Sequence, residues 1–257
     1  AGNPANAAVS YFEKLGIVPK TEIASWVNAL GDGKVATTVV RDAQLALASA
    51  KPSSRLGPPK LPQARSNELA KLVAYVPQKV ATSFPIDVYD VILLGRRPYI
   101  NWNVSESDRK IVSSVIRKLS LEDFVFRKFH NLSGGEQQKA IVAKAIVQQP
   151  RVYLFDEPTS NLDLFNQYEI LKQIKELVSD NGNPCSAIVA MHDINLASRF
   201  ADKIMILHES KIFCYDEPRI VLNSDVISQV YRVDAEVNIS EKLGKPVINI
   251  LGPQEDK

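Results

Sequence analysis

Short apolar runs alternate with longer helical patterns between residues 66 and 215. Apolar residues dominate positions 72–76, 151–155 and 187–191, and each run has the length of a buried strand. Positions 105–119 instead carry apolar residues on one helical face, which predicts a helix. The alternation predicts an α/β fold in which helices cover a parallel sheet.

The later part of this segment has the order of one β-α-β unit. Apolar residues at helical spacing lie between the runs at 151–155 and 187–191, and the breaker sequence at 180–184 separates this helix from the second run. Such a unit is expected to cross over with a right hand. Functional groups are expected at the carboxyl ends of its strands.

The first 65 residues follow a different pattern. Residues 21–30 have the spacing of a one-faced helix, Asp32 and Gly33 form a turn signal, and the β-branched residues at 35–40 favour a strand. A proline-rich stretch at 51–62 indicates a loop or linker. The expected organisation is an atypical segment 1–65, a core 66–225 with a helical subdomain, and a C-terminal extension 226–257.

Composition narrows the class of partner. Lys and Arg number 31 against 29 Asp and Glu, a balance that does not predict a nucleic-acid partner. No apolar run approaches the ~18 residues of a membrane-spanning helix. Cys185 and Cys214 lack metal-ligand spacing, which favours a reducing cytoplasm and small buried thiols.

The strongest motif is Leu132-Ser133-Gly134-Gly135-Glu136, followed by a helical run through Val147. Adjacent glycines allow the backbone to approach a ligand closely, and a helix N-terminus behind Ser133 favours anionic oxygens. As an isolated pattern, Ser-Gly-Gly is a common turn. The other motifs along the chain favour a ligand-binding site over a simple turn.

Two acids end the apolar run at 151–155. Asp156 can hold Mg²⁺, through water, and Glu157 can polarise an attacking water. In isolation the same pattern also fits a strand end with exposed acids. His192 follows the next apolar run, where it can contact a γ-phosphate, although a lone histidine there is more often a boundary residue.

Together with Val73-Ala-Tyr-Val-Pro-Gln78 and Ser160-Asn-Leu-Asp163, these motifs closely resemble the ATP-binding-cassette ATPases over about residues 66–250. The resemblance implies a parallel sheet of the P-loop NTPase kind with a helical subdomain, ATP as substrate and Mg²⁺ as cofactor. Two residues are implied to be catalytic: Glu157 as the base and His192 as the switch histidine. The implied metal residues are Asp156, in the Walker B position, and Gln78, in the glutamine loop.

The resemblance further implies a set of nucleotide-binding residues: Gln78, the signature residues Ser133, Gly134, Gly135 and Glu136, and Asp163 in the D-loop. The signature is expected to close on ATP that is bound by a second copy. Residues 87–99 and 230–237 look like importers of metal chelates such as ferric siderophores, haem and cobalamin. The implied partners are permease subunits, a second ATPase copy and, indirectly, a substrate-binding protein, at the cytoplasmic face of the membrane.

The chain departs from the family pattern at the phosphate loop, G-x-x-x-x-G-K-[ST] between a strand and a helix. Gly31, Gly33 and Lys34 match part of it and are the candidate phosphate-binding residues, but Asn28 and Val35 replace a glycine and the hydroxyl residue. The predicted order here is helix, turn, strand. A divergent working loop, a degenerate subunit, and an N-terminal segment joined by a frame error or fusion all fit this departure.

The sequence is therefore compatible with three functions. The first is the ATP-hydrolysing subunit of a metal-chelate importer. The alternative is a degenerate cassette that docks to transporter subunits without binding ATP. A third, a cassette ATPase without a transporter, is disfavoured by the importer-like residues 87–99.

Overall fold

The computed structural model describes residues 35–40, 70–78, 85–179, 185–209 and 211–254. The chain divides into two compact units, Pro58–Gln173 and the pair of segments Ala1–Gly57 and Ile174–Lys257. The chain passes from the first unit to the second within one helix, α8, Leu164–Ser179.

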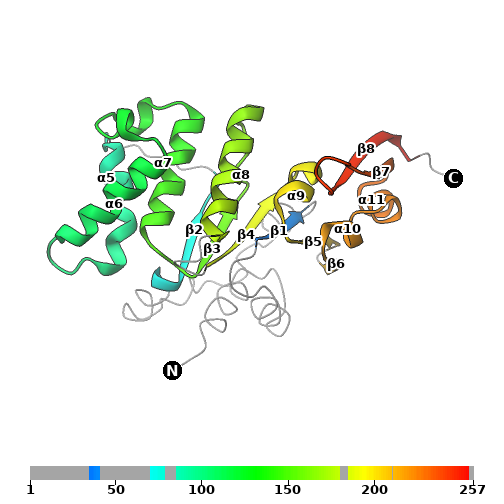
Figure 1. Ribbon diagram of the computed structural model, residues 1–257, viewed down its shortest axis with the longest axis horizontal. Helices are drawn as coiled ribbons and strands as arrows, with labels where there is room; N and C mark the ends of the chain where they lie inside the picture. The colour runs from blue at the N-terminus through cyan, green and yellow to red at the C-terminus, as the bar shows by residue number, and fades with distance from the viewer. Residues whose placement is uncertain (1–34, 41–69, 79–84, 180–184, 210, 255–257) are drawn as a thin grey trace, which may run out of the picture. The chain divides into compact units, whose positions relative to one another are not determined.

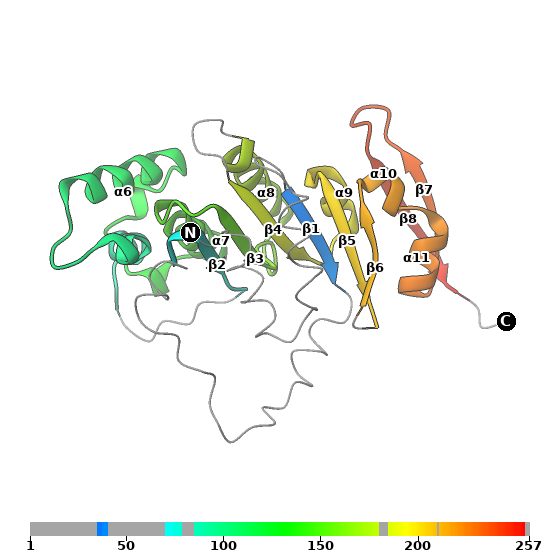
Figure 2. The same cartoon turned by 90° about the horizontal axis from the view of Figure 1, so that it is seen from below.

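The unit that contains the C-terminus has four neighbouring strands in the order β4, β1, β5, β6 (Figure 2). β1, Val35–Val40, lies parallel to both β4, Ser186–Met191, and β5, Lys203–His208. β6, Lys211–Asp216, pairs with β5 in the antiparallel sense. The strands predicted at 35–40 and 187–191 are thus confirmed, and the N-terminal segment supplies an inner strand.

A C-terminal hairpin follows two short helices in this unit, α10, Pro218–Val221, and α11, Ser224–Tyr231. Its strands are β7, Val233–Ile239, and β8, Pro246–Pro253. β8 is held against α9, Ile194–Phe200, by two hydrogen bonds. The Asn195 side chain donates to the Ile248 carbonyl at 3.0 Å and accepts from the Ile248 backbone N–H at 2.8 Å. These bonds fix the hairpin on the helix that follows β4.

The other unit combines two parallel strands with a group of helices. β2, Val73–Val76, pairs with β3, Val152–Asp156. The helices α5, α6 and α7 pack against one another (Figure 1). The helical segments of this unit, apart from α8, are α5, Val88–Leu93; η1, Leu94–Tyr99; α6, Glu106–Lys118; η2, Glu122–Phe124; η3, Phe129–Asn131; and α7, Gly134–Val147.

Capping residues fix where the two long helices of this group begin. Ser105 accepts a hydrogen bond from the Asp108 amide, and the Asp108 carboxylate accepts one from the Ser105 amide, a capping box at the start of α6. Ser133 and Glu136 form the same arrangement at the start of α7. The predicted helices are therefore confirmed, with Ser105 and Ser133 standing just before them.

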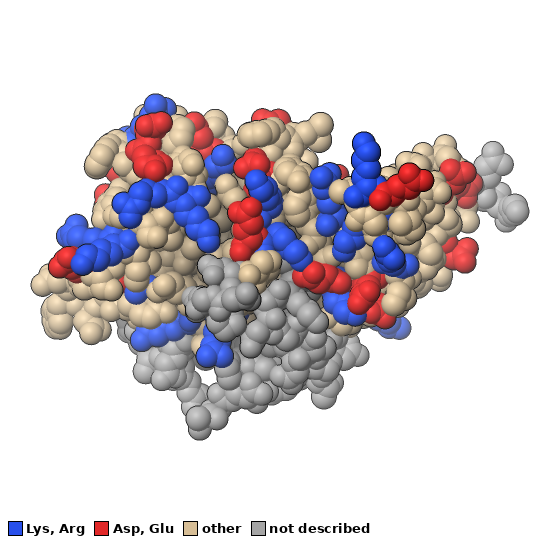
Figure 3. Space-filling view, viewed as in Figure 1, with Lys and Arg blue, Asp and Glu red and all other residues tan. Residues whose placement is uncertain are grey.

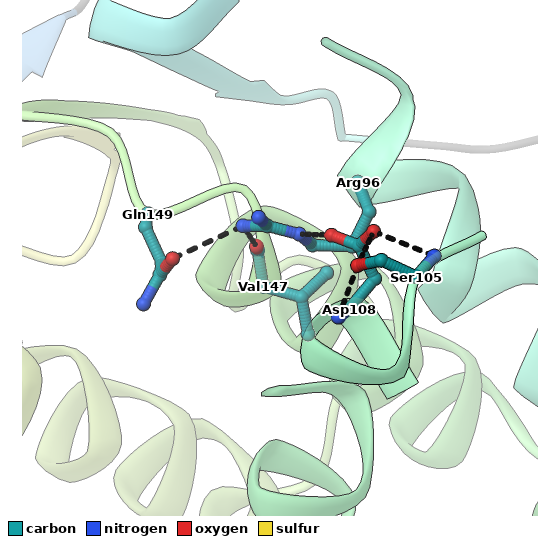
Figure 4. A network of polar contacts seen from close by, with 5 residues as sticks. All are labelled: Arg96, Ser105, Asp108, Val147 and Gln149. Carbon is teal, nitrogen blue, oxygen red and sulfur yellow. Dashed lines mark hydrogen bonds and ion pairs between the residues drawn. The ribbon is translucent and has the colours of Figure 1, made fainter. Parts of the chain in front are cut away.

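A buried ion pair connects η1, α6 and the end of α7 (Figure 4). The Arg96 guanidinium donates to Asp108 Oδ1 at 2.8 Å, to the Val147 carbonyl at 2.7 Å and to Gln149 Oε1 at 3.0 Å. Arg96 and Asp108 are each 5% exposed. A buried charge pair is tolerated when its donors and acceptors have partners, and here Nε and Nη1 of Arg96 and both carboxylate oxygens of Asp108 have them.

The surface and the cysteines agree with the sequence composition. Basic and acidic side chains are interspersed on the face shown in Figure 3. Cys185 is buried, as predicted, whereas Cys214 was also predicted to be buried and is only half-buried. Within the described ranges, no helix combines the length and the apolar character needed to cross a bilayer.

Candidate functional site

The two acids at the end of β3 are each held by a side chain from β2 or its extension. The Tyr75 hydroxyl donates to Asp156 Oδ2 at 2.9 Å, and the Gln78 amide donates to Glu157 Oε2 at 2.5 Å. β2 and β3 are parallel, so their carboxyl ends meet at one edge. Gln78, Asp156 and Glu157, which the sequence assigns to one site, are brought together here.

Glu157 adopts an unusual backbone conformation. Its φ of 45° lies in the left-handed region, which bulky residues enter at a cost of about 1–3 kcal/mol. Only 9% of the residue is exposed. The strand ends at Asp156, and the two successive carboxylates have separate partners, Tyr75 and Gln78, which allows them separate roles.

The donor set at this edge fits Mg²⁺. Magnesium is commonly bound through one or two carboxylates, several waters and substrate phosphates, rather than by a full cage of protein ligands. Asp156 supplies a carboxylate whose Oδ2 accepts the hydrogen bond from Tyr75. The part of the chain that the structure describes contains no cluster of three or more His, Cys, Asp or Glu residues arranged to hold a metal.

The signature residues form the first turn of α7. The Ser133 amide donates to Glu136 Oε2 at 2.7 Å, and the Glu136 amide donates to Ser133 Oγ at 3.4 Å. The bond from the Ser133 amide is the main cause that holds the pKa of Glu136 below its ordinary value. Glu136 is therefore ionised at neutral pH and serves to fix the turn that presents Ser133.

Asp163 caps the following helix, α8. Its carboxylate accepts one hydrogen bond from the backbone N–H of Asn166 at 2.8 Å and another from the side-chain amide of Asn166 at 2.9 Å. These bonds lower the pKa of Asp163. A Cβ placed on Gly135 would lie 3.1 Å from the Asn166 side chain. Asn166 therefore stands between the signature glycine and Asp163. A Cβ on Gly134 would have no neighbour within 4 Å.

His192 belongs to the other unit and follows the end of β4. It is exposed, and the next residue, Asp193, caps α9 through a 2.8 Å hydrogen bond from the Leu196 amide. The carboxyl end of β1 lies at the same edge, because Val39 pairs with Met191. This placement at a strand end agrees with the sequence expectation for His192.

Gly31, Gly33 and Lys34 lie outside the described residues. The residue that follows them, Val35, begins β1 and pairs with Ala187, near the start of β4. The chain thus enters β1 from the edge opposite to the one at which His192 follows β4. A phosphate loop of the standard kind instead follows the carboxyl end of a strand.

Two residues of the site were missed in the sequence, Tyr75 and Asn166. Tyr75 pairs with Leu154, so it shares a face with residue 156, but this register is set by the pairing of strands that are distant along the chain. Asn166 carries a usable signal, because a short polar residue three positions after a helix-capping Asp often bonds back to the cap. Tyr75 lies within the motif Val73–Gln78, but no role was assigned to it, and Asn166 lies outside the motifs.

Comparison with known proteins gives matches over most of the chain. Residues 21–160 match the family model described as ABC transporter. An uncharacterized ABC transporter ATP-binding protein of Methanocaldococcus jannaschii is 46% identical over 185 residues, which are 72% of this chain and 70% of that protein. A hemin import ATP-binding protein of Thermobifida fusca is 32% identical over 181 residues, 70% of this chain and 63% of that protein.

A relative that extends further along the chain is a petrobactin import ATP-binding protein of Bacillus anthracis, 28% identical over 232 residues, 90% of this chain and 84% of that protein. Among solved structures, a metal-chelate type ABC transporter in an inward-facing conformation is similar, with a TM-score of 0.69 at 22% identity and 87% coverage of both chains. A dimeric ATP-binding cassette bound to ADP and Pi has a TM-score of 0.57 at 23% identity, over 73% of this chain and 87% of that one. At these identities the structural likeness concerns the fold.

Proposed function

The chain belongs to the ABC transporter family, and on that premise we propose that it is the ATP-hydrolysing subunit of an importer of metal chelates. The observation that carries the proposal is the acid pair at the end of β3, with Asp156 held by Tyr75 and Glu157 held by Gln78. The hemin and petrobactin relatives support the metal-chelate class, as do the importer-like residues 87–99.

Each residue of the pair has a distinct task in this proposal. Bound Mg²⁺ would neutralise the charge that develops on the transferred phosphoryl group. Asp156 holds the cation, and Glu157 accepts a hydrogen bond from the attacking water and draws its proton away. Gln78, which donates a hydrogen bond to Glu157, serves the metal and the nucleotide, and His192 contacts the γ-phosphate.

The signature contributes from a second copy of the chain. Ser133, Gly134 and Gly135 present a helix N-terminus, whose unpaired amides favour anionic phosphate oxygens. The proposed assembly is a pair of ATPase subunits attached to permease subunits at the cytoplasmic face of the membrane, with a substrate-binding protein acting indirectly. The cassette dimer among the structural neighbours supports this arrangement.

The proposal is tested by exchanging the catalytic base for its amide. Glu157→Gln keeps the shape of the side chain and removes its ability to accept a proton. We expect ATP turnover of the purified chain to fall about 100-fold or more, because general-base catalysis contributes roughly that factor. Binding of Mg-ATP, measured by calorimetry, should persist in the variant.

A matched control is Glu122→Gln, which changes an exposed acid in η2 and should leave turnover at the wild-type rate. Turnover by Glu157→Gln at the same rate as the wild type would remove Glu157 from the role of base.

A further inference from the structure

Tyr75 lies on the same face of the paired strands as Asp156. It is directly opposite Leu154, and Asp156 stands two residues further along β3, which returns to the same face. An aromatic side chain is long enough to span the distance to such a diagonal neighbour. The tyrosine ring crosses that gap, and its hydroxyl meets Asp156 Oδ2 at 2.9 Å.

Packing alone does not account for the position of the tyrosine. Tyr75 is 51% exposed, whereas its neighbours Ala74 and Val76, on the opposite face, are at most 1% exposed. If residue 75 only covered this face of the sheet, a hydrophobic side chain without a hydroxyl would serve equally well. The hydroxyl at the end of the ring instead donates a hydrogen bond to one oxygen of the proposed metal carboxylate.

The chemistry of the hydroxyl suits a support for a metal ligand. A tyrosine hydroxyl donates a hydrogen bond without carrying a positive charge, so it orients a carboxylate without cancelling the negative charge that attracts a cation. A lysine or arginine at the same place would compete with the cation. Hydrogen bonds to ligating carboxylates are known to tune metal affinity.

We propose that Tyr75 is a positioning residue for the divalent cation: its hydroxyl holds Asp156 Oδ2 and thereby directs Oδ1 toward the metal and its waters. This inference rests on the proposed function, because it assigns a task within the same ATP site. The segment from Tyr75 to Gln78 then supports both acids, one residue for the metal carboxylate and one for the base.

The test replaces only the hydroxyl, with Tyr75→Phe in the full chain. Mn²⁺ serves as the probe, and its binding is measured by electron paramagnetic resonance in the presence of a non-hydrolysable ATP analogue. We expect the Mn²⁺ dissociation constant to rise about 10-fold, the lower end of the effect of removing an outer-shell partner. Affinity for the analogue without metal, and the midpoint of thermal unfolding, should stay at the wild-type values.

Tyr99→Phe is the matched control, because it removes a tyrosine hydroxyl from η1 and keeps the ring that Arg96 and Lys71 contact. It should bind Mn²⁺ as the wild type does. An unchanged Mn²⁺ affinity in Tyr75→Phe would overturn the inference and leave the proposed function intact. A wild-type chain that binds neither the analogue nor Mn²⁺ would overturn the proposed function, and this inference with it.

Discussion

At the scale of single residues, the proposed base Glu157 has a left-handed backbone conformation, with a φ of 45°. A strand that continued with regular alternation would send residue 157 to the face opposite Asp156. The left-handed turn ends this alternation after Asp156, and the Glu157 carboxylate accepts a hydrogen bond from the Gln78 side-chain amide. The strained backbone therefore lies at the proposed base, and strain of this kind is common at functional sites.

How far the site could be predicted differs from residue to residue. Asp156, Glu157 and His192 were correctly expected at strand ends, because a polar residue directly after an apolar run marks the end of a strand. The partner of Asp156 could not be found in this way, because Tyr75 meets it only through the register of β2 with β3. The left-handed turn at Glu157 also has no local signal, since glutamate is not a residue that favours it.

Asp108→Asn tests the buried ion pair at the residue scale. The change leaves the Arg96 guanidinium buried without its charged partner, and breaking a buried pair in this way costs about 3–5 kcal/mol. We expect urea denaturation at pH 7 to show a loss of that order. Asp123→Asn, which changes an exposed acid, should alter the free energy of unfolding by less than about 0.5 kcal/mol.

The same pair predicts a dependence on pH. The hydrogen bond from the Ser105 hydroxyl, together with Arg96, lowers the pKa of Asp108 below its value of about 3.9 in an unfolded chain. The stabilisation is therefore present above pH 4 and is lost as the pH falls through the lower folded-state pKa. The difference in free energy of unfolding between wild type and Asp108→Asn should become smaller as the pH falls. A difference that becomes larger would contradict this account.

At the scale of elements, the apolar runs and the helical spacing identified β1, β2, β3, β4, α6, α7 and α8. Their periodicity is local, so it is visible in the sequence. The C-terminal hairpin was anticipated only as an extension. Its alternation of side chains was present in β7, but the surface that covers β8 is supplied by α9, more than 40 residues earlier along the chain.

Gly95 determines how closely η1 approaches α7. A Cβ at this position would lie 2.0 Å from the Lys144 carbonyl oxygen and 2.6 Å from Val147 Cγ2. The first of these atoms belongs to the helix backbone, so the clash cannot be relieved by a side-chain rotation. We expect Gly95→Ala to lower the free energy of unfolding by about 1–3 kcal/mol, measured by urea denaturation.

Gly134→Ala is the control for this experiment, because a Cβ there has no neighbour within 4 Å. Alanine is also a better helix former than glycine, so the control should be neutral or slightly stabilising. Equal stability of the two variants would show that η1 and α7 can separate without cost.

At the scale of the whole molecule, the main question is how the N-terminal segment serves the ATP site. Residues 35–40 form an inner strand, and the family match begins at residue 21, so both findings favour a segment that belongs with the rest of the chain. Against the assignment of Lys34 to the phosphates, the next residue enters β1 at the amino end. The order of elements therefore differs from a standard phosphate loop.

Lys34→Ala tests that assignment. If Lys34 contributes one charge-assisted hydrogen bond to phosphate, its loss corresponds to about 1.5–3 kcal/mol, or roughly a 10-fold to 100-fold weaker affinity for Mg-ATP. This weakening is the result that the assignment predicts. An affinity equal to that of the wild type would place the phosphates elsewhere.

The measurement that tests the central claim most directly is calorimetric titration of the purified full chain with Mg-ATP. An ATP-hydrolysing subunit must bind its substrate, so we predict saturable binding of about one nucleotide per chain, with a metal dependence set by Asp156. No heat of binding at millimolar Mg-ATP would contradict the account and would leave a cassette that docks to its transporter without a nucleotide site of its own.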